Sequence, residues 1–104
     1  MITKEMLIAA ATRYDVKPVE GVEGCFVREC TRADFRWALG KSDTEQEAEE
    51  RMVCVSACDG MGNLLLTRDD VETVKTFGFQ VVRKIAEASM DINGMNVPDE
   101  PGKN

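Results

Sequence analysis

The segment from Ser42 to Cys58, SDTEQEAEERMVCVSAC, constrains this chain most, because its two halves differ sharply in polarity. Carboxylates crowd its first turns, where the positive end of a helix dipole favours them, so we expect a helix starting at Ser42 or Asp43. One stripe of this helix holds Ala48, Met52 and Val55. From Met52 onward, almost every face of the helix carries apolar side chains. A helix that is apolar all round must be covered on every side, so its second half should lie at the centre of the core.

The part of the chain before this helix predicts two helices and a hairpin. Thr3 can cap a first helix that runs to about Tyr14. Pro18 and the glycines between Val16 and Cys30 exclude a helix there and favour a β-hairpin. A second helix should follow, capped by Thr31, with Asp34 reaching back to the cap and Gly40 ending it in a left-handed conformation.

The part after it predicts two more helices. Thr67 should open a helix that turns Val71, Val74 and Phe77 inward, and Gly78 should break it. Residues 79–92 are strongly amphipathic: Gln80, Arg83, Lys84, Glu87 and Asp91 share one arc, opposite Phe79, Val82, Ile85, Ala86 and Ile92. Asn93-Gly94 should stop this helix. We therefore expect a mainly helical α+β fold, with four to five helices and a β-hairpin after the first, as one domain over residues 1–92 and a flexible tail over 93–104.

Composition restricts the function classes. The chain has 104 residues and a formal net charge of −6, and its basic residues are scattered, which argues against nucleic-acid binding. No apolar run approaches the about 18 residues that span a bilayer, and the first residues do not resemble a signal peptide, so we expect no membrane association and a cytosolic location. There is no histidine to act as a base and no phosphate-binding glycine loop, so we expect no enzyme activity.

The stretch Cys58–Val71, CDGMGNLLLTRDDV, has the look of a calcium loop. Counted from Asp59, however, the closing position is Asp70 instead of glutamate, and the frame that centres Gly62 puts Arg68 there. Both frames lack the required oxygen ligands. We expect turns at Asp59-Gly60 and Gly62-Asn63, a short extended run at Leu64–Leu66, and then a helix start.

The four cysteines leave one alternative open. Cys25 and Cys30 are spaced C-x4-C, and Cys54 and Cys58 are spaced C-x3-C, whereas zinc knuckles usually have the spacing C-x-x-C. Buried structural thiols are the favoured interpretation, with no metal and no cofactor. The alternative is a small cytosolic module that senses metal or redox state through four cysteines.

The order of these features resembles a known family. The runs GCFVRECTRADFRWAL and RMVCVSACDGMGNLLLTRDDVETVKTFGFQVVRKIAEASMDINGM resemble the tail assembly chaperones of long-tailed, HK97-like bacteriophages. The resemblance covers roughly residues 24–95. It is carried by Arg28-Glu29, Thr31, Asp59-Gly60, Leu64–Leu66, Thr67, Asp69-Asp70-Val71 and Asn93-Gly94.

The resemblance implies a non-catalytic binding protein. Such chaperones coat the tape measure protein in the host bacterial cytoplasm, help to recruit the tail tube protein, and are absent from the mature virion. Many are also made as a longer, frameshifted form, and Gly102-Lys103-Asn104 is compatible with slippery codons. Weak homo-oligomers are expected. A generic acidic adaptor protein is a further alternative.

Binding a client requires apolar side chains at the surface. Phe35 and Trp37 are two residues apart on a short helix and cannot both face one core, so one of them is a candidate contact. Phe77 and Phe79, on either side of Gly78, are the other candidates. The competing interpretation is that all four pack in the core.

Overall fold

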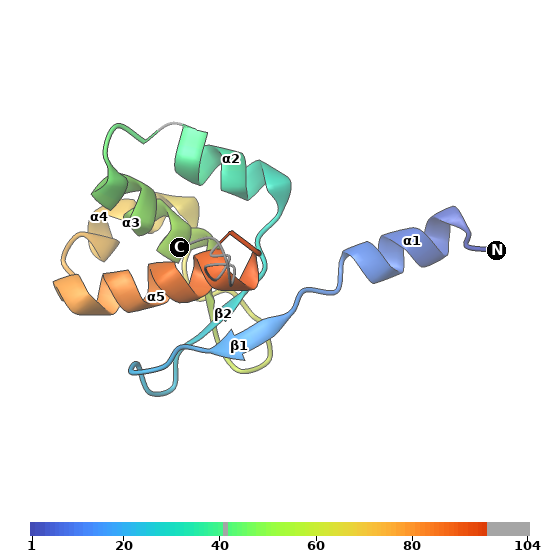
Figure 1. Cartoon of the computed structure of the whole chain (residues 1–104), viewed down its shortest axis with the longest axis horizontal. Helices are drawn as coiled ribbons and strands as arrows, with labels where there is room; N and C mark the ends of the chain where they lie inside the picture. Colours follow the sequence, from blue (N-terminus) through green and yellow to red (C-terminus); the bar gives the residue numbers. More distant parts are fainter. Residues whose placement is uncertain (41, 96–104) are drawn as a thin grey trace, which may run out of the picture.

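The computed structural model describes residues 1–40 and 42–95, and it confirms a mainly helical α+β fold (Figure 1). Its α-helices are α1 (Lys4–Ala11), α2 (Arg32–Gly40), α3 (Glu45–Ser56), α4 (Val71–Val74) and α5 (Phe79–Ile92), and a 3-10 turn, η1 (Arg68–Asp70), precedes α4. The strands are β1 (Val16–Pro18), β2 (Phe26–Arg28) and β3 (Ala57–Cys58). The remaining residues of the expected tail, 96–104, lie outside the described residues.

The predicted hairpin is present and gains a third strand. β1 and β2 pair antiparallel with Lys17 opposite Val27, and β3 pairs with the other edge of β2, where Val27 faces Ala57. The sheet order is therefore β1-β2-β3. We expected residues 57 and 58 to continue the helix, and this was wrong. Ala57 adopts an extended conformation, with ψ of 126°, because pairing with β2 overrides local helix preference there.

The core is built around the end of α3, as its sequence requires. All seven residues from Met52 to Cys58 are buried. α2 and α5 pack on α3, and α5 also contacts β2. The helix starts later than expected, because the Thr44 side chain accepts the N–H of Glu47 and makes Thr44 the cap.

α2 begins as predicted and ends differently. The Thr31 hydroxyl accepts the N–H of Asp34 at 3.1 Å, which confirms the cap. The Asp34 carboxylate does not return to the cap; it binds Arg68 at 2.6 Å and so ties α2 to η1. Gly40 remains within α2 and is not among the described glycines with positive φ, so the expected left-handed cap is wrong.

The remaining helices form a corner around Gly78. Thr67 and Asp70 cap η1 reciprocally, and Val74 is fully buried in α4, as expected. Gly78 then separates α4 from α5, which spans the predicted residues 79–92. Gly94, with φ of +77°, ends the helix. Asn93 is not loose: its side chain accepts the N–H of Cys30 at 3.1 Å, which holds the end of α5 against the start of α2.

α1 stands apart from this body (Figure 1). Thr3 caps it as predicted, but it ends at Ala11, three residues before the predicted Tyr14. Every residue of α1 is exposed. Tyr14 instead lies under Arg28, whose guanidinium carbon is 4.5 Å from the ring centre, so the chain joins the body only from there on.

Candidate functional site

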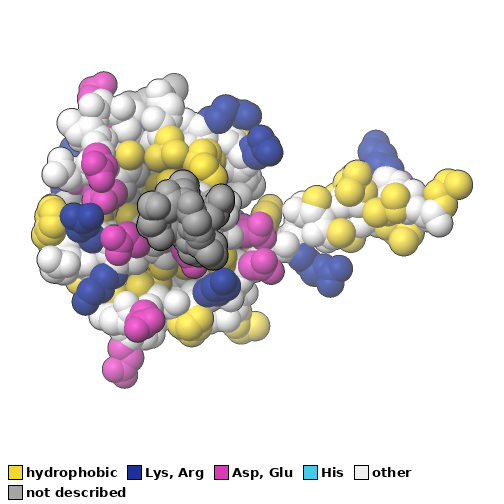
Figure 2. Space-filling model, in the orientation of Figure 1, with side chains coloured by type: hydrophobic (Ala, Val, Ile, Leu, Met, Phe, Trp, Pro, Cys, Tyr) yellow, Lys and Arg dark blue, Asp and Glu magenta, His cyan; other side chains and the backbone are white. Residues whose placement is uncertain are grey.

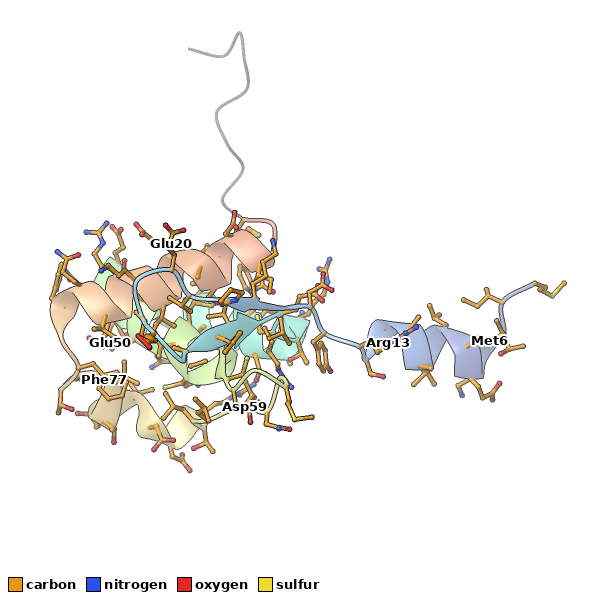
Figure 3. The ribbon with its side chains drawn as sticks, turned by 90° about the horizontal axis from the view of Figure 1, so that it is seen from below. Met6, Arg13, Glu20, Glu50, Asp59 and Phe77 are labelled. Atoms are coloured by element: carbon orange, nitrogen blue, oxygen red, sulfur yellow. The ribbon has the colours of Figure 1, made fainter. Side chains whose placement is uncertain are left out.

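The candidate contact residues Phe77 and Phe79 line one hollow at the corner between α3, α4 and α5. The hollow measures about 240 Å³ and is lined by Gln46, Glu49, Glu50, Val74, Lys75, Phe77, Phe79 and Val82. Figure 3 shows Phe77 and Glu50 at this end of the molecule. An apolar floor with charged residues around it is the composition expected of a site that receives a side chain from a partner.

The corner itself produces the arrangement. The Phe77 N–H donates to Val74 O and closes α4, and Val82 N–H donates to Gly78 O and opens α5. Gly78 is extended between the helices, and the two rings on either side of it line the same hollow but differ in exposure. Phe77 packs against the core, whereas Phe79 is 59% exposed in the first turn of α5. The competing interpretation, that all four aromatic candidates pack in the core, therefore does not hold for Phe79.

The charges around the hollow are mostly negative. Burial raises the pKa of Glu49, and neighbouring carboxylates raise it further, although Arg83 lowers it. The ammonium group of Lys75 is bound to Glu72 at 3.0 Å, an ion pair that raises the pKa of Lys75. Arg83 lies 6.0 Å from the centre of the Phe79 ring. The hollow thus combines an exposed aromatic ring with an acidic wall, and a basic group flanking an apolar side chain would complement it.

Phe35 belongs to a different hollow. Half-buried in α2, it lines a depression of about 440 Å³ together with residues of the opposite end of α5. Two arginines, Arg32 and Arg36, also line it, which makes this depression more basic than the hollow at Phe79. The structure therefore does not unite Phe35 with Phe77 and Phe79 in one site.

Trp37 is held within the fold. Arg51 and Arg68 lie against its ring, with guanidinium carbons 4.9 Å and 5.1 Å from the ring centre. Trp37 packs against both core clusters, and Phe35 packs against the cluster of Ala38, Met52 and Val55. The expectation that only one of the two rings could face the core was wrong, because large side chains reach inward from both flanks of α2.

The Asp59 turn binds its own backbone. The Asp59 carboxylate accepts the N–H groups of Met61 and Asn63 at 2.9 and 3.0 Å, and these bonds lower its pKa. Gly62 takes a positive φ of +87°. The Leu65 N–H donates to Ala57 O, so the following apolar run lies beside β3. The stretch that resembled a calcium loop is a turn whose carboxylate is engaged by its own loop.

The four cysteines are not arranged as a metal site in the described part of the chain. All four are free thiols; Cys54 and Cys58 are buried, and Cys25 and Cys30 are half-buried. Over residues 1–40 and 42–95, no group of three or more histidine, cysteine, aspartate or glutamate side chains is placed to hold a metal ion. Burial raises the pKa of all four thiols, to about 11 for Cys54. High pKa values disfavour the thiolate that metal binding and redox chemistry require.

A further groove was not predicted as a site. It measures about 320 Å³ between α3 and α5 and is lined by Leu39, Glu45, Ala48, Glu49, Met52, Arg83, Ala86, Glu87 and Met90. The signal was present in the sequence, since Ala48 and Met52 lie on the apolar stripe of α3, and Ala86 on that of α5. Met52 and Ala86 are buried, whereas Ala48 is only half-buried, and helical periodicity alone does not show how much of a stripe stays open.

The fold and these hollows define a small, mainly helical α+β protein with open apolar depressions at its helix junctions. Among the described residues no helix has both the length and the apolar character needed to cross a membrane. Searches against protein-family models, curated proteins and solved structures find no significant match to this chain.

Proposed function

We propose that this chain is a tail assembly chaperone of a long-tailed bacteriophage. It binds segments of the tape measure protein in the host bacterial cytoplasm, helps to recruit the tail tube protein through a frameshifted longer form, and leaves before the virion is complete. The observation that carries the proposal is the open hollow at Phe77 and Phe79, where an aromatic ring is 59% exposed beside an acidic wall.

The size of the hollow favours a protein client. Pockets for whole small molecules usually measure about 300 to 1,000 Å³, and this one measures about 240 Å³. A hollow of this size suits one or two side chains of a helix that lies across the corner, the mode by which an amphipathic helix anchors its apolar face in a groove. Glu49 and Glu50 would then accept lysine or arginine residues that flank the client's apolar stripe.

The test is co-expression of this chain with the product of the long helical-protein gene expected beside its own gene. We expect the two proteins to purify as a complex. Phe79→Ala should weaken the complex about tenfold or more, because it removes the burial of a large ring on binding. Leu65→Ala is the matched control, since Leu65 is 58% exposed but does not line the hollow.

Two results would contradict the proposal. One is the absence of any complex between the co-expressed proteins. The other is a complex that Phe79→Ala and Leu65→Ala weaken equally, which would place the contact elsewhere on the surface.

A further inference from the structure

α1 is an apolar helix that none of the described residues covers. Met6, Leu7 and Ile8 are 54%, 56% and 51% exposed, and no residue of the helix is buried. Figure 2 shows hydrophobic side chains along its visible face, well away from the body. Isolated helices shorter than about 12 residues are marginal in water, and one with apolar residues around most of its circumference is typical of a buried position. An eight-residue helix of this kind needs a surface to pack on.

The segment that follows α1 is fixed to the body of the protein at Asp15. The N–H of Asp15 donates to the Glu29 carboxylate at 3.0 Å, and the N–H of Glu29 donates to Asp15 O at 3.0 Å. Only Thr12 and Arg13 lie between the end of the helix and the stacked ring of Tyr14. A short linker therefore holds α1 away from the body, and this linker is anchored at Tyr14 and Asp15.

The groove between α3 and α5 has the complementary shape and chemistry. Leu39 and Met90 provide half-buried apolar walls, and Met52 and Ala86 are buried beneath them. The small side chain of Ala48 allows another helix backbone to approach closely. Three carboxylates, Glu45, Glu49 and Glu87, line the groove with a single arginine, Arg83. α1 has the opposite balance, since Lys4 and Arg13 flank its apolar residues and Glu5 is its one acid.

Charge separates this groove from the depression at Phe35, and size separates it from the hollow at Phe79. The depression at Phe35 is lined by Arg32 and Arg36, which would repel Lys4 and Arg13. The hollow at Phe79 also has an acidic wall, but it is smaller, at about 240 Å³ against about 320 Å³.

We propose that α1 of one copy of this chain docks in the α3–α5 groove of a second copy. Apolar side chains of α1 fill the groove, and Lys4 and Arg13 pair with its carboxylates. The two contacting surfaces differ, so each copy offers one helix and one groove. The inference rests on the weak self-association that belongs to the proposed function and names its contact surfaces, but the contact requires no client.

A charge exchange tests this pairing with folded, full-length chains. One variant carries Lys4→Glu and Arg13→Glu, which gives it an acidic α1, and the other carries Glu45→Lys and Glu49→Lys, which gives it a basic groove. Each variant alone should self-associate at least about tenfold more weakly than the unchanged chain, because like charges then meet across the contact. An equimolar mixture should recover the association, since the acidic α1 of one variant fits the basic groove of the other and the unaltered pair also matches. Sedimentation velocity over a concentration series measures all four samples.

Two further variants complete the design. Leu7→Ser should weaken association without changing the fold, because Leu7 is exposed in the single chain. Lys17→Glu with Glu23→Lys reverses two exposed charges outside the groove and should leave association unchanged. Circular dichroism verifies that each variant is folded.

Three outcomes would overturn the inference: a chain that is monomeric up to about 1 mM, charge variants that associate like the unchanged chain, or a mixture that does not recover. Failure of client binding leaves these measurements untouched, and a monomeric chain that still binds its client would remove only the self-association. The two proposals therefore fail separately.

Discussion

The hydroxyl groups of Ser56 and Ser89, both fully buried, form a hydrogen bond with each other. Ser56 lies in the last turn of α3, Ser89 lies in α5, both are 0% exposed, and their oxygens are 2.5 Å apart. The bond joins the two central helices at residues 33 positions apart in the chain. The chain around Ser56 is buried as well, since every residue from Met52 to Cys58 is buried.

Removing one partner should cost more than removing both. Ser56→Ala leaves the Ser89 hydroxyl without its partner and should lower the free energy of unfolding by about 1–3 kcal/mol, and Ser89→Ala should do the same. The double variant removes both polar atoms, so its loss should be less than about 1 kcal/mol. The two substitutions are thus expected to be strongly non-additive, as contacting residues usually are.

Urea unfolding followed by circular dichroism measures the free energy of unfolding of the three variants. The slope of this free energy against urea concentration should be the same in all of them. Thr76→Ala is the control; it removes an exposed hydroxyl, and its effect should stay within about 0.5 kcal/mol. Single losses below about 0.5 kcal/mol that simply add in the double variant would refute the reasoning. They would mean that each hydroxyl finds another partner when the first is removed.

Three other substitutions test the core, the thiols and the turn. Met52→Ala, at a side chain that is 1% exposed, should lower the free energy of unfolding by about 2–5 kcal/mol in urea, because it opens a cavity in the core. Burial raises the pKa of Cys54 from its ordinary 9.0 to about 11, so the unfolded chain loses this proton first. The free energy of unfolding should therefore fall as the pH rises from 9.0 toward about 11, and Cys54→Ala should flatten part of this fall. Gly62→Ala should cost about 1–2 kcal/mol in thermal unfolding, because φ is +87° there and the new Cβ would lie 3.1 Å from Val16; an unchanged melting temperature would contradict this.

Local chemistry allowed most helix boundaries to be predicted. The caps at Thr3, Thr31 and Thr67 and the stops at Gly78 and Gly94 rest on bonds or backbone angles within a few residues, so the sequence alone contains them. Boundaries that depend on distant partners were predicted incorrectly. Residues 57 and 58 leave the helix because β2, thirty residues earlier, offers an open edge, and Asp34 leaves its cap because Arg68 is within reach.

The same division applies to the sites. Phe77 and Phe79 could be chosen as candidates because Gly78 between them had to break a helix, which brings both rings to one corner. The cation contacts that hold Trp37 come from Arg51 in α3 and Arg68 in η1, and no local pattern reveals them. The sequence alone thus indicates that Phe77 and Phe79 lie close together, but it does not reveal the two arginines beside Trp37.

α1 shows why periodicity predicts burial but not the molecule that provides it. Its apolar residues satisfy the same spacing whether they pack on their own chain or on another one. The groove between α3 and α5 lies beside core residues: Met52 and Ala86, which line it, are buried, and Ala48 is half-buried. Among residues 1–40 and 42–95, α1 has no buried residue and the groove stays open, and the groove is mainly acidic whereas basic residues flank α1. Docking α1 of one copy in the groove of a second copy would bury the helix and fill the groove at the same time.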